Sequence, residues 1–247
     1  MKLEDCMRVI TLSDVNMHFN MPKEKVSSLK EYLIKLMKGQ LHYEKFVALE
    51  NINLEIKKGE VFGIVGLNGS GKSTLLKLIA GILSPTYGTV SVNGTVAPLI
   101  ELGAGFDPDL TARENIYLNG SVLGFPRKMI NRHFDEIVAF SEMEDFIDVP
   151  MKNYSSGMIA RVAFAIATIV KSDILIVDEI LAVGDFRFQE KCEARIAHLM
   201  SGGTTVIIVS HSIDQIERLC NRVMWLERGQ VRMIGGKEVC KAYSGAD

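Results

Sequence analysis

The feature that most constrains this sequence is a glycine-rich turn placed between an apolar run and a helix-forming run. Residues 61–81, VFGIVGLNGSGKSTLLKLIAG, contain the spacing Gly66-x-x-x-x-Gly71-Lys72-Ser73 directly after the apolar segment. A strand, a glycine loop and a helix in this order form a phosphate-binding loop, whose backbone N–H groups face phosphate oxygens. We expect Lys72 to reach the β- and γ-phosphates and Ser73 to bind Mg²⁺. The candidate nucleotide-binding residues of the loop are Gly66, Asn68, Gly69, Ser70, Gly71, Lys72, Ser73 and Thr74.

A dinucleotide-binding loop of the form Gly-x-Gly-x-x-Gly is the main alternative for this stretch. That loop needs a third glycine after Gly69-Ser70-Gly71, and the position holds Thr74. The turn is therefore predicted to bind the phosphates of a mononucleotide.

Short apolar runs rich in β-branched residues alternate with helical stretches along the chain. The runs occupy residues 61–65, 174–178 and 204–210, and the alternation is typical of a mainly parallel sheet covered by helices. Residues 89–100 indicate strands around an Asn93-Gly94 turn, and residues 222–236 indicate a hairpin turned at Arg228-Gly229. We expect both to add antiparallel strands to the main sheet of an α/β fold.

Strand patterns disappear between about Thr111 and Val170. Thr111 and Glu114 have the spacing of a capping box, which opens a run of helices. We expect a helical subdomain over about residues 111–170, ending where residues 174–178 return the chain to the sheet. No internal repeat or low-complexity linker is visible, and residues 1–247 are predicted to form a single domain.

Two polar sites follow apolar runs that we expect to be strands. Asp178 and Glu179 follow ILIV, and His211 follows VIIVS. The carboxyl ends of strands are where α/β sheets bind ligands. Asp178 is a candidate Mg²⁺ ligand, Glu179 a candidate general base for the attacking water, and His211 a candidate contact to the γ-phosphate. The alternatives are solvated carboxylates and a structural histidine.

Composition limits the class of protein. The chain has 28 basic and 30 acidic residues and a net charge of −2, which argues against general attraction to nucleic acid. The four cysteines form no Cys-x-x-Cys pair, and we interpret them as reduced thiols of a cytosolic protein. The N-terminus carries acids where a signal peptide needs an apolar run, and no stretch approaches the roughly 20 apolar residues that span a bilayer.

The motif YSSGM at residues 154–158 precedes a long, almost wholly apolar stretch that we expect to be helical. Ser155 and Ser156 are good helix-capping residues, and Gly157 lets a ligand approach N–H groups that lack an intrahelical partner. The motif therefore either caps a buried helix or forms an anion site.

These motifs and their order resemble the ATP-binding-cassette (ABC) family, from about Val9 to Gly235. The resemblance implies the P-loop NTPase fold of ABC nucleotide-binding domains, with ATP and Mg²⁺ as cofactors and ATP hydrolysis coupled to transport. Residues 154–158 match the family signature L-S-G-G-Q, so Ser155, Ser156 and Gly157 are expected to cap the γ-phosphate of ATP held by a second copy of the chain. Asp185 matches the D-loop that couples the two sites, and an ordinary helix cap is its alternative.

Two positions depart from the family pattern. The family usually has a glutamine between the sheet and the helical region, where this sequence has Glu101. Glu101 is a candidate ligand for Mg²⁺ or water, with a plain strand-end glutamate as the alternative. The aromatic residue that stacks on adenine aligns with Phe19, and Tyr43 and Phe46 are its alternatives.

The stretch IELGAGFDPDLTARENI at residues 100–116, the motif YSSGM and a long insert before Phe46 are similar to one branch of the family. That branch exports lipid-linked polysaccharides such as O-antigen or teichoic acid. It implies a homodimer at the cytoplasmic face of the inner membrane, bound to membrane-spanning permease subunits that select the glycan. The alternatives are an ABC ATPase driving another cargo, or a soluble ABC protein of DNA repair or translation.

The insert, residues 22–45, carries six lysines against three glutamates. Val26, Leu29, Leu33 and Leu36 recur at helical spacing, which predicts a short amphipathic helix. The helix either packs on the rest of the protein with a solvated lysine face, or lies at the membrane surface near the permease.

Overall fold

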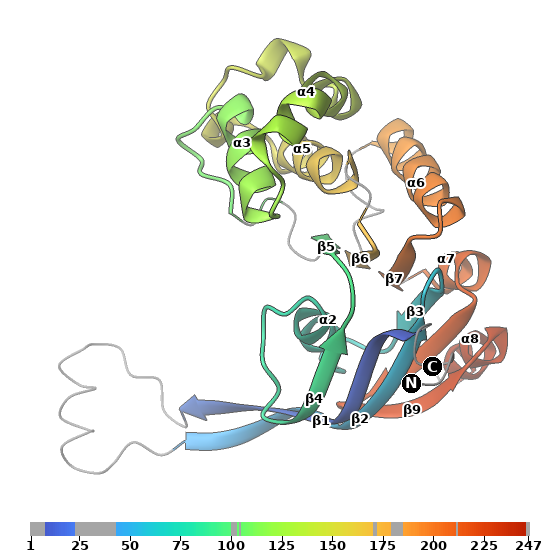
Figure 1. Cartoon of the computed structure of the whole chain (residues 1–247). Coiled ribbons are helices and arrows are strands. Elements are labelled where there is room, and N and C mark those ends of the chain that lie inside the picture. The colour runs from blue at the N-terminus through green and yellow to red at the C-terminus, as the bar shows by residue number, and fades with distance from the viewer. Residues whose placement is uncertain are drawn as a thin grey trace, which may run out of the picture.

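The computed structural model describes residues 8–22, 43–99, 103, 105–169, 172–178, 185–210 and 212–245. These residues form a six-stranded sheet, a three-stranded sheet and a group of helices at one end of the molecule (Figure 1). The six-stranded sheet consists, in spatial order, of β5 (Val96–Leu99), β6 (Ile174–Asp178), β7 (Thr205–Val209), β3 (Val61–Val65), β8 (Arg222–Glu227) and β9 (Gln230–Gly235). The first five strands run parallel, and β9 is antiparallel to β8.

The parallel strands form where the sequence predicted them. Every residue of β3 and β7 is buried, as are the first four residues of β6. Continuous burial of this kind occurs in a sheet that is covered on both faces. The prediction of an α/β fold with a mainly parallel sheet is therefore confirmed.

One face of this sheet is covered by α2 (Lys72–Ile79) and by the three-stranded sheet. The latter is antiparallel and consists, in spatial order, of β2 (Tyr43–Lys57), β1 (Arg8–Pro22) and β4 (Tyr87–Val92). Leu75 and Leu76 of α2 are fully buried in the core that both sheets share. The helix that follows the glycine-rich turn is thus held between two sheets.

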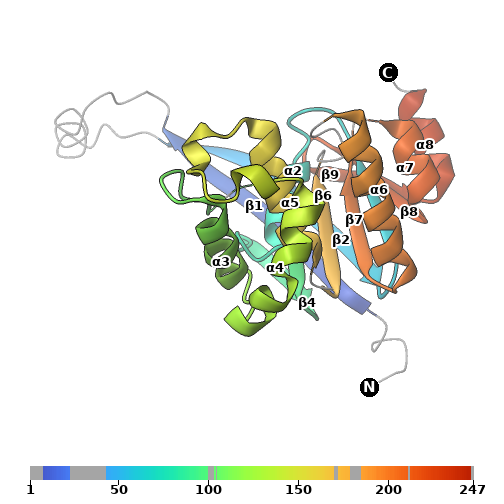
Figure 2. The same cartoon turned by 90° about the horizontal axis from the view of Figure 1, so that it is seen from above.

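The other face is covered by helices, which are labelled in Figure 2. They are α5 (Ser156–Ile169), α6 (Phe186–Ser201), α7 (Ile213–Leu219) and α8 (Lys237–Ser244). Phe164 of α5, Phe188 of α6, Ile216 of α7 and Val239 of α8 are buried in one core with the strands.

The predicted helical subdomain is present between β5 and β6 in the sequence. It contains α3 (Ala112–Val122), α4 (Arg127–Ser141), the 3₁₀ turns η2 (Glu144–Phe146) and η3 (Met151–Asn153), and α5. Thr111 caps α3 through a capping box, as expected: its Oγ1 accepts from the N–H of Glu114 at 3.2 Å, and Glu114 accepts from the N–H of Thr111 at 2.8 Å. A separate apolar core holds these helices together.

Strands flank both predicted turns, but the expectation that residues 89–100 add antiparallel strands to the main sheet is wrong. β4 pairs antiparallel with β1 in the three-stranded sheet, whereas β5 pairs parallel with β6 in the six-stranded sheet, so Asn93-Gly94 connects two sheets. The N–H and hydroxyl of Thr95 both donate to the Asp173 carboxylate at 2.8 Å, which ties the start of β5 to β6. The β8–β9 hairpin turns at Arg228-Gly229 as predicted.

The amphipathic helix expected within residues 22–45 falls on residues 23–42, outside the described part of the chain. The ends of that range are strand rather than helix. Pro22 ends β1, residues 43–45 begin β2, and Pro22 and Tyr43 are register partners. In the described ranges, no helix combines the length and hydropathy needed to cross a bilayer.

The burial of two thiols allows a test of the fold. Burial raises the pKa of Cys192 and of Cys220 to about 12. The thiolate is the reactive form, so both residues should resist iodoacetamide at about pH 8 in the folded protein and react readily in guanidinium. Peptide mapping by mass spectrometry measures this difference. Equal labelling of Cys192 in the folded and unfolded protein would contradict the packing of α6 described here.

Candidate nucleotide-binding site

The turn between β3 and α2 has the backbone of a phosphate-binding loop. Gly66, Gly69 and Gly71 all have positive φ, at 155°, 79° and 105°. At Gly66 a Cβ would lie 2.2 Å from the carbonyl oxygen of Leu226 and 2.7 Å from Ser70 Oγ, so only glycine fits. Gly71 precedes α2 in the left-handed conformation, and no side chain caps the helix. The first N–H groups of α2 therefore remain for a ligand.

Lys72 places its ammonium group against the start of this loop. Its Nζ donates to the carbonyl oxygens of Gly66 at 2.7 Å and Leu67 at 3.1 Å, and the residue is buried. A buried cation beside N–H groups at a helix start attracts an anion.

A cavity of about 230 Å³ opens beside the loop, and we call it the nucleotide pocket. It is lined by Phe46, Ala48, Asn68, Gly69, Gly71, Lys72, Ser73 and Thr74. The structure thus brings six of the eight loop residues predicted from the sequence to one cavity. Of the other two, Gly66 allows the tight turn of the backbone, and Ser70 is buried.

Phe46, rather than Phe19, is the aromatic side chain at the nucleotide pocket. The two residues are register partners on β2 and β1. Phe19 packs against the core, whereas Phe46 is 49% exposed and lies two residues from Ala48, on the same face of β2. The lining of the pocket thus favours Phe46 over Phe19, and which aromatic residue stacks on adenine stays a prediction. The side chain of Tyr43 lies outside the described residues.

Asp178 lies at the same edge of the sheet as the phosphate loop. It ends β6, its register partner is Val209 of β7, and β7 is the strand next to β3. Since all three strands are parallel, their carboxyl ends meet at one edge. The predicted residues Glu101, Glu179 and His211 lie outside the described residues, so their positions stay predictions.

The oxygen donors at this edge suit Mg²⁺. Ser73 offers a hydroxyl and Asp178 a carboxylate, and Mg²⁺ is usually bound by one or two such groups together with substrate phosphates. Across the described ranges, no group of three or more His, Cys, Asp or Glu residues forms a metal site. A hydroxyl and a carboxylate are donors that fit an ion bound together with substrate phosphates.

The residues of the motif YSSGM lie at the start of α5. Tyr154 is buried and its hydroxyl donates to the Phe146 carbonyl oxygen at 2.6 Å. Ser155 Oγ accepts from the N–H of Met158 at 3.2 Å, so it caps the helix. Ser155 and Ser156 are exposed. The capping alternative therefore describes Ser155 within one chain, and the exposed turn stays available to a partner.

Arg161 is a site residue that the sequence analysis missed. Its guanidinium donates to Asp185 and to Glu142, each at 2.5 Å, and lies 4.6 Å from the ring centroid of Phe188. Asp185 also caps α6 by accepting from the N–H of Phe188 at 3.1 Å. This hydrogen bond, together with the charge of Arg161, lowers the pKa of Asp185. The available signal was that Arg161 is the only charged residue of α5.

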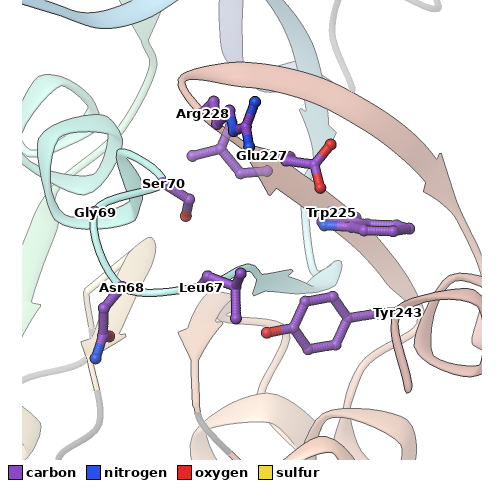
Figure 3. A pocket seen from close by; sticks show the side chains of 9 residues that line it. Leu67, Asn68, Gly69, Ser70, Trp225, Glu227, Arg228 and Tyr243 are labelled. Carbon is purple, nitrogen blue, oxygen red and sulfur yellow. The ribbon is translucent and has the colours of Figure 1, made fainter. Parts of the chain in front are cut away.

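A second cavity of about 230 Å³ adjoins the same loop from the side of β8, and we call it the β8 pocket (Figure 3). It is lined by Leu67, Asn68, Gly69 and Ser70 of the loop, by Trp225, Leu226, Glu227 and Arg228, and by Tyr243 of α8. The rings of Trp225 and Tyr243 meet edge to face with centroids 5.5 Å apart. Within the described structure, the buried Ser70 Oγ has no hydrogen-bond partner. No sequence motif predicted this pocket.

The fold and this loop define a phosphate-binding α/β protein of the P-loop class. The family model described as ABC transporter matches residues 49–182, which is more than half of the chain. The chain belongs to the ABC transporter ATP-binding family. The family, the fold class and the ATPase class predicted from the sequence are therefore confirmed.

Curated relatives and solved structures agree with this assignment. An O-antigen export system ATP-binding protein, RfbB of Klebsiella pneumoniae, is 43% identical over 93% of this chain and 94% of its own length. A teichoic acids export ATP-binding protein, TagH of Bacillus anthracis, is 41% identical over 91% of this chain and 40% of its own length. The dimeric ATP-binding cassette MJ0796 bound to ADP and phosphate has a TM-score of 0.74 at 24% identity and covers 92% of this chain and 98% of its own, which shows the shared fold.

Substitution of Gly66 tests the phosphate loop. In Gly66→Ala the new Cβ collides with the Leu226 carbonyl oxygen, so the loop must open. Nucleotide affinity should then fall on the order of 10²-fold or more, which corresponds to the free-energy cost of an overpacked contact. Titration with a fluorescent ATP analogue measures the loss. Gly81→Ala is the matched control, because Gly81 also has positive φ but has no atom within 4 Å of the added Cβ. Equal affinity in the two variants would contradict the proposed loop.

Proposed function

We propose that this chain is the ATP-hydrolysing subunit of an ABC transporter that exports a lipid-linked polysaccharide of the O-antigen or teichoic acid type. The observation that carries the proposal is the phosphate loop with Lys72 bound inside it, in a chain similar over nearly its whole length to O-antigen export ATPases. The protein acts as a single domain at the cytoplasmic face of the cell membrane. It works as a homodimer with permease subunits and contacts the glycan only indirectly.

In the proposed site, ATP lies in the nucleotide pocket with its base against Phe46. Lys72 and the N–H groups of the loop hold the β- and γ-phosphates, and Ser73 and Asp178 hold Mg²⁺. When bound, Mg²⁺ neutralises charge on the phosphate oxygens during phosphoryl transfer. Glu179 orients and deprotonates the attacking water, and His211 contacts the γ-phosphate. Glu101 assists the ion or the water.

The exposed start of α5 supports a site shared between two copies. Ser155 and Ser156 are exposed, and a Cβ added at Gly157 would meet nothing closer than Ser155 Oγ at 3.8 Å. An open helix start with free N–H groups favours a phosphate brought by another molecule. In the proposed dimer, this turn of each copy covers the γ-phosphate of ATP in the other copy.

Apolar side chains on the helical region support a permease contact there. Leu118 and Val122 of α3 are 38% and 68% exposed and lie four residues apart on one face of the helix. Phe146 of η2 is 47% exposed. Exposed apolar side chains that gather on one helix face, as Leu118 and Val122 do, mark candidate interaction sites. The lysine-rich insert, residues 22–45, is proposed to lie near the membrane surface beside the same partner.

Replacing Glu179 tests the chemistry. Glu179→Gln removes the general base, so ATP binding should persist while turnover falls on the order of 10²- to 10⁴-fold. Single-turnover phosphate release measures the rate. Glu190→Gln on the exposed side of α6 is the matched control and should leave turnover unchanged. Near-normal turnover in Glu179→Gln would remove Glu179 from this role.

Mixing two inactive variants tests the shared site. Lys72→Ala damages the phosphate loop and Gly157→Asp damages the covering turn, so each homodimer has two defective sites. A heterodimer has one site with both lesions and one intact site. With random pairing in a two-fold dimer, the mixture should regain about a quarter of wild-type ATPase activity. A mixture as inactive as its components would show that each chain completes its own site.

A further inference from the structure

The β8 pocket has the character of a receptor for an aromatic ring. Trp225, Tyr243 and Leu67 border its open space (Figure 3). The pocket measures about 230 Å³, more than the roughly 150 Å³ of an apolar cavity that binds benzene, and its lining is mixed, with Asn68, Ser70, Glu227 and Arg228 beside these apolar groups. Edge-to-face and stacked contacts with a further ring add to the area that such a pocket buries.

The chain also presents an exposed aromatic ring at the start of α6. Phe186, the first residue of α6, is 72% exposed, the largest value among the exposed large apolar side chains of the described residues. Leu67 of the phosphate loop is itself 60% exposed at the edge of the β8 pocket. Both side chains are costly to leave in water and become favourable when they are buried together.

Phe186 is linked by a hydrogen bond of its neighbour Asp185 to α5, the helix whose first turn, at Ser156 and Gly157, is proposed to reach the other copy. It follows Asp185, and Asp185 is held by Arg161. Arg161 lies on α5, five residues after Ser156, where that helix begins. When Ser156 and Gly157 of one chain approach the phosphate loop of the other, Phe186 must therefore approach with them.

We propose that in the dimer the partner's Phe186 inserts its ring into the β8 pocket. The inference rests on the proposed two-fold dimer, in which each copy supplies one ring and one pocket. The β8 pocket and the nucleotide pocket share Asn68 and Gly69 as lining residues. The inserted ring thus supports the phosphate loop from the side opposite ATP, so nucleotide binding and dimer formation strengthen each other.

The chain contains one tryptophan, Trp225, and this makes the contact directly measurable. In a Glu179→Gln background with ATP, the emission of Trp225 should shift as the dimer forms, because the ring displaces water from the pocket. Phe186→Ala should abolish this shift and weaken the dimer roughly 30-fold for each of the two symmetric contacts that it removes, the usual effect of removing an aromatic hot spot. Tyr87→Ala, which removes an exposed ring from β4, is the matched control and should change neither quantity.

A double-mutant cycle decides whether the ring enters this pocket. Tyr243→Ala should weaken the dimer like Phe186→Ala, and the double variant should be little worse than either, since both remove one contact. Sedimentation velocity gives the dissociation constants. The proposed contact would be wrong if the two single-variant increases in the dissociation constant multiply in the double variant. It would also be wrong if the emission shift survives Phe186→Ala in a fully dimeric sample, since another group must then occupy the pocket. If the Glu179→Gln parent stays monomeric with ATP, the shared site of the proposed function fails instead.

Discussion

The phosphate loop depends on a backbone brace from the turn between β8 and β9. Gly229 donates its N–H to the Ser70 carbonyl at 2.9 Å, and its own carbonyl accepts from the N–H of Glu50 at 2.8 Å. A Cβ at Gly229 would lie 2.7 Å from the Ala48 carbonyl, so no side chain fits between these segments. One residue thus fixes the loop against β2, the strand that carries Phe46. The phosphate loop and β2, which line the nucleotide pocket from two sides, are therefore both positioned by Gly229.

Much of the fold could be predicted because local chemistry decides it. Continuous apolar runs specify the buried parallel strands, and the Thr111 capping box specifies the start of α3. The Arg228-Gly229 turn forms because both residues adopt positive φ, at 49° and 79°, as a tight hairpin requires. Asn93-Gly94 has equally good turn chemistry, yet its flanking strands find other partners. That choice is made by β1 and β6, which lie far away in the sequence.

In the candidate site, too, local sequence predicts some residues, whereas others come together only through the tertiary fold. The phosphate loop is contiguous in the sequence, so its residues were identified together. The aromatic wall depends on strand register, so the sequence alone could name Phe19, Tyr43 and Phe46 as candidates but could not show that Phe46 lines the pocket. The hydrogen-bond partners of Arg161 lie 19 and 24 residues away along the chain. The sequence therefore shows a single charge in an apolar helix but does not show which carboxylates it binds. The β8 pocket has no motif of its own because three segments that are far apart in the sequence form it.

The helical region is joined to α6 through charges as well as through apolar contacts. Glu142 accepts from Arg161 and Lys191, and Glu136 accepts from Arg195. Burial acts to raise the pKa of both carboxyls, but the hydrogen bonds from these cations lower it. Their contribution is therefore present at neutral pH and is lost as the pH falls through the lowered pKa values. Exposed charges are also screened by salt. Acid and high ionic strength therefore weaken the ion pairs that join the helical region to α6, while the apolar contacts of Phe164 and Phe188 are unaffected by charge.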